Sequence, residues 1–287
     1  MKLGIACSSG SFKGVFVHGV LSSFEKEGLE VYMYGGASSS VGPAAYAAVG
    51  RLDLLEGPCY WDRMYSRYQE NGSDISKTIL ELIDEITPPL KHHLFEDSSA
   101  RFGISVNEVI TEEAAEVTQG AGARRLGKQL VLATRKHDNS WAKKHLKLRF
   151  FETGSENPQY KLTPHNMKEV LYATTRMLHA WKVPAWIDGK PYVDASYTCM
   201  CPALELVRRG CEQIIAITPE HGNLYRDFFQ TEPMPASYHG VPIHVVQPDS
   251  DLAELDVNYM SITSEGLSRV FQLGEEAGSG FLTRRVV

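Results

Sequence analysis

A serine in a short run of small residues is the first candidate for chemistry in this chain. The run GASSS at residues 36–40 lies between an apolar and aromatic stretch, residues 31–34, and an alanine-rich stretch, residues 44–49. These flanks predict a buried strand before the run and a compact helix after it. A serine on such a sharp strand-to-helix turn projects out of the sheet as a nucleophile. The helix N-terminus adds partial positive charge where an alkoxide or oxyanion would form.

The motif can be aligned in two ways. The usual pattern, G-x-S-x-G, places Ser38 at its centre and leaves Ser40 where the last glycine would be. Counting back from Gly42 instead places Ser40 at the centre. We favour Ser38, because the residue two before a nucleophile on a tight turn is best as glycine and Gly36 provides it. The alternative to a nucleophile is a small-residue turn that only packs a helix on a sheet.

A second small-residue loop follows the first apolar run of the chain. Residues 3–6 are apolar, residues 8–14 read SSGSFKG, and a helical pattern covers residues 15–27. Such a loop exposes backbone N–H groups and therefore suits an anion, either a phosphate or an oxyanion. A dinucleotide fingerprint and a Walker loop both fail here, because neither spacing is present. Lys13 adds positive charge beside the loop.

An aspartate, Asp194, ends a short apolar stretch late in the chain. It follows a predicted hairpin turn at residues 187–190 and precedes a helix at 202–209 and an apolar β run at 213–217. A carboxylate beside a serine hydroxyl can accept its proton. A single aspartate is also a common turn or cap residue, so Asp194 gains weight only together with the serine.

Periodicity along the chain predicts the elements that would position these residues. We expect helices at 74–87 (ended by Pro88-Pro89), 106–117, 163 to about 179 and 264–282 (with Gly274 as a point where it could break), and strands at 129–134 and 243–246. Alternating strands and helices predict an α/β fold with a mostly parallel central sheet and helices on both faces. Sites in such sheets form at the carboxyl ends of strands, where both small-residue loops would lie.

The order of these motifs resembles that of patatin-like phospholipases. That family has G-G-G-x-R/K-G after its first strand, then G-x-S-x-G, then D-G-G or D-G-A. Residues 9–14 follow the first pattern in the middle glycine, the basic residue and the last glycine. Residues 36–40 follow the second and residues 194–196 the third, with a helix and a strand after the aspartate as in the family.

The likeness covers nearly the whole chain, but each motif is degenerate. Ser40, Ala195 and Ser196 stand where the family has glycine, and residues 175–180 read TRMLHA where it usually has S-x-A-x-P-G. The resemblance implies a patatin-like three-layer sandwich. It also implies one acyl hydrolase domain over residues 1–287, with a helical insertion or cap at about residues 60–125.

The resemblance implies hydrolysis of acyl esters by a Ser–Asp dyad. Ser38 would attack the ester carbonyl and Asp194 would act as general base. Backbone N–H groups of Gly10 and Ser11 would hold the oxyanion, an effect of about 3 kcal/mol per donor.

The remaining matched residues, Lys13, Gly14 and Gly36, would support the two loops. The substrate would be an acyl ester or a phospholipid, reached in transient contact with a membrane surface, and no cofactor or metal would take part. Acyl transfer to an alcohol or amine on the same scaffold is one alternative. A catalytically impaired acyl-binding relative is the other, suggested by the replaced glycines.

Histidines and cysteines add no second site by their spacing. His92 and His93 are adjacent, so their side chains point apart, and we expect them in a loop. His179 takes the family's usual proline position, where a packing role is expected, and no histidine lies in a triad motif. Cys199 and Cys201 form a lone C-x-C, which is a weak metal signal without a second ligand pair.

Composition fits a soluble enzyme and excludes some classes. The chain has 287 residues and is 43% hydrophobic, with a net charge of −6; its mean hydropathy is −0.23 and its pI about 5.9. An acidic chain argues against a nucleic-acid partner. No apolar run approaches the roughly 20 residues that span a bilayer, and no signal peptide is expected. Because no secretory signal is expected, the five cysteines, an odd number, indicate reduced thiols and a cytoplasmic location.

Overall fold

The computed structural model describes residues 1–96 and 100–285. Its strands are β1 (Leu3–Cys7), β2 (Met33–Gly36), β3 (Arg101–Val109), β4 (Leu146–Glu152), β5 (Trp186–Ile187), β6 (Lys190–Val193), β7 (Gln213–Ile217), β8 (Ser237–Tyr238) and β9 (Val241–Val246). Its helices are α1 (Gly14–Lys26), α2 (Val41–Ala48), α3 (Pro58–Glu70), α4 (Ile75–Glu96), α5 (Glu112–Gln119), α6 (Ala123–Thr134), α7 (Ser140–His145), α8 (Met167–Thr175), α9 (Ala203–Arg208) and α10 (Ser264–Arg285).

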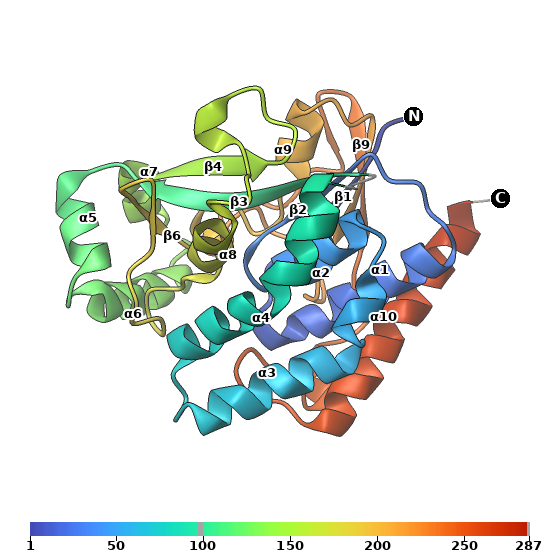
Figure 1. Ribbon diagram of the computed structural model, residues 1–287, viewed down its shortest axis with the longest axis horizontal. Helices are drawn as coiled ribbons and strands as arrows, with labels where there is room; N and C mark the ends of the chain where they lie inside the picture. Colours follow the sequence, from blue (N-terminus) through green and yellow to red (C-terminus); the bar gives the residue numbers. More distant parts are fainter. Residues whose placement is uncertain (97–99, 286–287) are drawn as a thin grey trace.

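The strands form one sheet in the order β5-β6-β3-β2-β1-β7-β9-β8, with β4 paired to β3. The five strands β3, β2, β1, β7 and β9 run parallel, and antiparallel strands are added at both sides. Helices α1, α2, α3, α4 and α10 lie on one side of the sheet and α9 on the other (Figure 1). The predicted α/β fold with a mostly parallel sheet and helices on both faces is confirmed.

The parallel strands bring both small-residue loops to one edge of the sheet. Cys7 at the end of β1 pairs with Gly36 at the end of β2 and with Ile217 at the end of β7. The loops that leave these three strands therefore start side by side. Each of the three strands is buried along most of its length, which fixes the positions of the loops.

Two predicted elements in the middle of the chain are wrong. Residues 106–117 were expected to form a helix, but β3 continues to Val109 and α5 begins at Glu112. Ser105 and Glu108 have the spacing of a helix capping box, but they lie within β3, where residues 104–107 alternate between apolar and polar types as in a strand. Residues 129–134, expected as a central strand, are the second half of α6, in which Val131 and Leu132 face solvent.

Two helices differ clearly from their expected bounds. The helix predicted to end before Pro88-Pro89 continues as α4 to Glu96, and its buried face extends through Leu90 and Leu94. Burial of that face stabilises the helix by more than the two prolines destabilise it. The helix expected from 163 is shorter, covering only Met167–Thr175.

The last helix, α10, does not break at Gly274. A Cβ atom built on Gly274 would lie 2.3 Å from the carbonyl oxygen of Phe16 in α1. The glycine thus lets the backbones of α1 and α10 approach closely. The hairpin at residues 187–190 and the strands at 213–217 and 243–246 are confirmed.

Residues 60–125, expected as a helical insertion or cap, hold more than helices. They contain most of α3, all of α4 and α5, and also β3, a strand inside the central sheet. No helix among the described residues is long and apolar enough to cross a bilayer.

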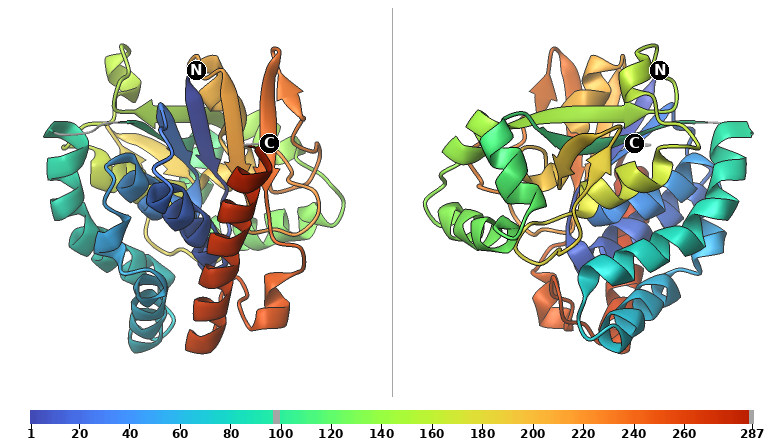
Figure 2. Two further views of the ribbon diagram at one scale, coloured as in Figure 1. Left: turned by 90° about the vertical axis from the view of Figure 1, so that its right-hand side faces the viewer. Right: turned by 60° about the vertical axis from the view of Figure 1, so that its left-hand side comes forward.

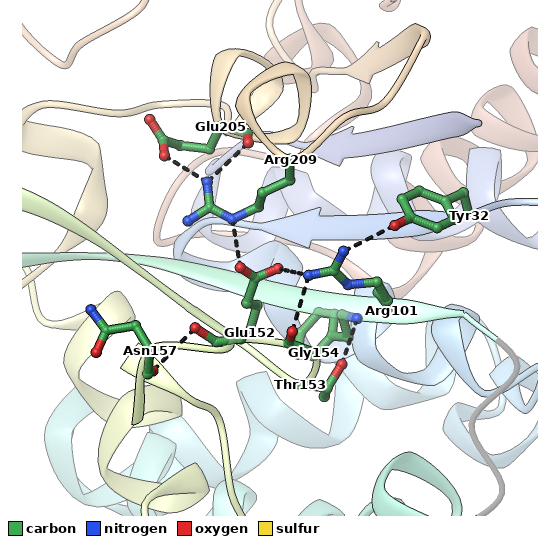
Figure 3. Close-up of polar contacts among 10 residues, drawn as sticks. Tyr32, Arg101, Glu152, Thr153, Gly154, Asn157, Glu205 and Arg209 are labelled. Carbon is green, nitrogen blue, oxygen red and sulfur yellow. Dashed lines mark hydrogen bonds and ion pairs between the residues drawn. The ribbon is translucent and has the colours of Figure 1, made fainter. Parts of the chain in front are cut away.

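A network of charged side chains joins strands at the other edge of the sheet, where β2 and β3 begin (Figure 3). Glu152 accepts hydrogen bonds from Arg101 at 2.7 Å and from Arg209 at 3.0 Å. Arg101 also donates to the Tyr32 hydroxyl at 3.0 Å, and Arg209 to Glu205 at 2.9 Å. The network connects the chain just before β2 with β3, β4 and the end of α9.

Candidate active site

Ser38 lies on a tight turn directly after β2. It has a φ of +53°, in the left-handed region that few non-glycine residues adopt, and it begins a single 3-10 turn that leads into α2. A Cβ atom on Gly36 would lie 3.0 Å from the Cα of Val41, so glycine is needed where the strand passes the helix. Strained backbone of this kind is found at functional sites.

The hydroxyl of Ser38 donates a hydrogen bond to Asp194, with 2.9 Å between Oγ and Oδ2. Ser38 is 9% exposed and Asp194 is fully buried. The other carboxylate oxygen of Asp194 accepts from the backbone N–H of Ser196 at 2.7 Å. The geometry thus brings together the two residues that the sequence proposed as a dyad.

Burial changes the basicity of this carboxylate. Loss of hydration raises the pKa of Asp194 to about 6, against the lowering effect of hydrogen bonds from Ser196 and Ser38. A carboxylate with a pKa near neutrality is a stronger base than an exposed aspartate.

Two polar residues that the sequence did not suggest hold the dyad in place. The backbone N–H of Ser38 donates to the Thr174 hydroxyl at 3.0 Å, which in turn donates to the carbonyl of Ser105 at 2.7 Å. The side-chain amide of Asn107 donates to the carbonyls of Asp194, at 2.7 Å, and of Ala195. Thr174 lies in the last turn of α8, and Asn107 is a buried polar residue within β3.

The hydroxyl of Ser40 makes a different contact from that of Ser38. It is fully buried, and its hydroxyl donates to the carbonyl of Ser8 in the first loop. The residue that replaces the usual glycine therefore ties the two loops together. This contact favours Ser38 as the centre of the motif.

The first loop places Gly10 and Ser11 on the wall of the same cavity as Ser38. A Cβ atom on Gly10 would lie 2.4 Å from the Cγ of Pro219, so a larger residue would displace the loop. Within residues 1–96 and 100–285, the backbone N–H groups of Gly10 and Ser11 have no hydrogen-bond acceptor, whereas that of Ser9 donates to Met200. Open N–H groups beside a nucleophile are suited to an oxyanion.

Lys13 anchors this loop rather than lining the cavity. It is 4% exposed, and its ammonium lies 3.0 Å from Asp251 and 3.4 Å from Glu220. It also lies 4.8 Å from the centre of the Tyr259 ring. Two carboxylates therefore neutralise its charge. Gly14, the next predicted support residue, begins α1.

A cavity of about 660 Å³ contains Ser38. One group of lining side chains is apolar and comes from α3, α4 and α8, namely Tyr60, Trp61, Met64, Ile75, Ile79, Leu82, Ile83, Ile86 and Leu171. A second group is largely polar and follows β7, namely Glu220, His221, Asn223, Tyr225, Asp227 and Gln230. In the left view of Figure 2, α3 and α4 lie on one side of the molecule and the orange segment after β7 on the other.

Comparisons with known proteins give little further guidance. No family model matches the chain, and no curated protein sequence matches it. Among solved structures, the crystal structure of VipD from Legionella pneumophila is similar over 99% of this chain and 67% of that chain, at 11% identity and a TM-score of 0.49. A similarity at this level carries no argument about function.

The histidines and cysteines do not form a metal site in the part of the chain described. His179 lines the cavity, its buried Nδ1 has no hydrogen-bond partner among the described residues, and burial lowers its pKa. His92 and His93 were expected in a loop but lie within α4. Cys199 and Cys201 are both buried, with pKa values raised by burial. Among residues 1–96 and 100–285, no group of three or more His, Cys, Asp or Glu could hold a metal ion.

Proposed function

We propose that this chain is a patatin-like serine acyl hydrolase that cleaves acyl esters with the dyad of Ser38 and Asp194. The observation that carries the proposal is the 2.9 Å hydrogen bond between the two side chains at the wall of a largely apolar cavity. A nucleophile within hydrogen-bond reach of its base is the geometry that covalent catalysis requires.

The reaction would proceed through an acyl-enzyme. Asp194 takes the proton from Ser38 as the Oγ atom bonds to the ester carbonyl carbon, and the carbonyl oxygen becomes an oxyanion beside the N–H groups of Gly10 and Ser11. Collapse of this intermediate breaks the bond to the alcohol, which leaves with the proton from Asp194. Water then repeats the sequence and releases the acid. An alcohol in place of water would give acyl transfer.

The replaced glycines leave the dyad contact in place, which supports an active enzyme over an impaired one. Ser40 finds a partner in the first loop, and Ser196 donates its backbone N–H to Asp194. Neither residue separates the nucleophile from its base. A single domain and a cytoplasmic location remain predictions from the sequence.

The cavity lining favours an uncharged alcohol portion over a phosphorylated one. Two carboxylates, Glu220 and Asp227, lie in the wall, and no lysine or arginine of the described residues lines it. A phosphate would therefore enter without a charged partner. We expect 1-oleoylglycerol to be cleaved at least about tenfold faster than oleoyl lysophosphatidate in matched detergent micelles, because an unpaired buried charge is costly. Equal or reversed rates would contradict this preference without removing the esterase activity.

Hydrolysis is tested with p-nitrophenyl esters of increasing chain length. We expect turnover that depends on Ser38 and increases from short to medium chains as the apolar wall is filled. A fluorophosphonate probe should label Ser38, identified by mass spectrometry of the modified peptide. Absence of turnover above a Ser38→Ala control across the series would refute the proposal. Products formed with an added alcohol acceptor distinguish hydrolysis from acyl transfer.

A further inference from the structure

Helix α6 carries an outer face that the proposed chemistry does not use. Its inner face, with Ala123, Gly127 and Leu130, is buried. Its outer face and the turn after it expose five basic residues and two aliphatic ones, namely Arg124, Arg125, Lys128, Arg135, Lys136, Val131 and Leu132. Leu132 is 56% exposed and Val131 is 37% exposed. A helix with basic and aliphatic residues on its solvent face is typical of a contact with a lipid surface.

The charge of this face contrasts with that of the whole chain. The chain has a net charge of −6, yet residues 117–137 contain no aspartate or glutamate. Within residues 1–96 and 100–285, the five basic side chains form no ion pair. A nearby carboxylate, Glu113, is instead paired with Lys144. Lys136 lies close enough to the exposed carboxylate of Asp138 to interact with it electrostatically. The other four basic side chains of this face are available to an anionic partner.

The same helix borders the candidate active site. Val131 and Thr134 line the cavity that contains Ser38, and Val131 is also exposed to solvent. Tyr259, another lining residue, is 50% exposed. Residues that both line a cavity and face solvent mark its opening, so the cavity opens beside α6.

The inner side of α6 is fixed to the rim. A Cβ atom on Gly127 would lie 2.1 Å from the backbone nitrogen of His179, so the helix packs closely on the segment that supplies Met177 and His179 to the cavity. Figure 2 (right) shows α5 and α6, in green, at the outer edge of the molecule. A surface held against this edge would lie next to the opening.

We propose that the outer face of α6 is a docking surface for membranes that contain anionic lipids. The basic side chains contact the head groups, while Leu132 and Val131 enter the boundary between head groups and acyl chains. A nucleic acid would also attract the charges but would gain nothing from exposed aliphatic side chains at the opening of an apolar cavity. Delivery of acyl esters to Ser38 rests on the proposed hydrolase function; docking itself does not.

The test is sedimentation with vesicles of phosphatidylcholine containing 0 or 40% phosphatidylserine, using the full chain and its Ser38→Ala variant. Both proteins should bind the anionic vesicles, release them in high salt and bind pure phosphatidylcholine much more weakly. Because binding needs no turnover, failure of docking and failure of hydrolysis are seen separately. Absence of binding to the anionic vesicles would overturn the proposal.

Matched variants locate the surface. The double change Arg124→Gln with Arg125→Gln should weaken binding by about 30-fold. Arg269→Gln with Arg284→Gln removes the same charge from α10, which lies on the other side of the molecule (Figure 1), and should change binding less than about twofold. Equal losses for the two pairs would show that net charge alone drives binding and would overturn the assignment to α6.

An apolar pair of variants separates a membrane from another polyanion. Leu132→Ser should reduce binding to the anionic vesicles several-fold, whereas Leu54→Ser, at another exposed leucine, should not. A membrane role would be contradicted if the protein bound duplex DNA at least as tightly as the vesicles, through Arg124 and Arg125. In that case Leu132→Ser would have no effect on binding to either.

Discussion

The two edges of the parallel sheet are built in opposite ways. At the edge where β1 and β2 end, Ser11 and Ser38 have φ values of +50° and +53°, and a buried aspartate faces a serine. At the edge where β2 and β3 begin, Glu152 receives hydrogen bonds from two arginines. The first edge contains strained backbone and a buried carboxylate that has no cationic partner in hydrogen-bond contact. At the second edge, the charged side chains form ion pairs.

This difference indicates where stability and activity come from. Strained backbone and a desolvated carboxylate cost stability and are kept where they serve chemistry. Paired charges that join several elements contribute to stability and have no contact with the cavity. Changes at the first edge should therefore affect mainly activity, and changes at the second should affect mainly stability.

The largest effect is expected for Ser38→Ala. We expect kcat/KM on p-nitrophenyl esters to fall by at least about 1000-fold, since removal of a nucleophile leaves only residual catalysis. Alanine at Ser40 serves as the control and should leave more activity, because that hydroxyl only ties the two loops. Thermal unfolding should show a Ser38→Ala protein as stable as the wild type. Retention of most activity would place the nucleophile elsewhere.

Asp194→Asn should nearly match that loss of activity while leaving the protein more stable at high pH. The two changes act on one unit, so the double variant should be little worse than either single one. Above pH 6 the buried carboxylate destabilises the fold by up to about 3 kcal/mol, because its pKa is higher than in the unfolded chain.

The destabilising contribution of Asp194 disappears as the pH falls from about 6 towards about 4, since the folded state then binds the proton first. The stability gain of Asp194→Asn should therefore be largest at pH 8 and small at pH 4, as measured by denaturant unfolding. A variant that is less stable than wild type at pH 8, or one with near wild-type activity, would show that Asp194 is a structural residue of the turn.

The pH dependence of activity follows from the same group. Only the ionised carboxylate accepts a proton from Ser38, so kcat/KM should rise with pH through about 6 and then level off. Below that point the rate should fall about tenfold per pH unit. An activity that is flat between pH 5 and 8 would argue against a base with this raised pKa.

The smallest effect is expected at the opposite edge. Glu152→Gln removes the carboxylate that joins Arg101 and Arg209 and should lower the free energy of unfolding by about 2 kcal/mol, because a mostly buried pair is broken. Glu113→Gln breaks an exposed pair with Lys144 and should cost less than about 0.5 kcal/mol. Activity of the folded Glu152→Gln protein should equal that of wild type, and a large loss would show that the edges are coupled.

The parts of the site that the sequence predicted are local in the chain. The turn at Ser38 and the loop at Gly10 are short runs of small residues between apolar stretches, and such junctions can be recognised without knowledge of the fold. Asp194 was found through its order after those two motifs. Its contact with Ser38 joins residues 156 positions apart, so its geometry required the structure.

The parts that the sequence did not predict depend on tertiary packing. Asn107 lies in β3, where the capping-box spacing of Ser105 and Glu108 suggested a helix, and its contact with Asp194 joins residues far apart in the sequence. Thr174 supports Ser38 from the end of α8 and resembles any helix residue in the sequence. The apolar run at residues 129–134 suggested a buried strand, but two of its side chains face solvent from α6.

The close packing of α1 against α10 has a consequence for synthesis of the protein. The first loop leads directly into α1, whose partner helix α10 is made about 240 residues later. While the chain is still on the ribosome, α1 has one side uncovered and the loop lacks its anchors at Asp251 and Tyr259. We therefore expect that a nascent chain with Ser38 and Asp194 already outside the ribosome does not yet cleave esters. Activity would begin only when α10 has emerged and packed.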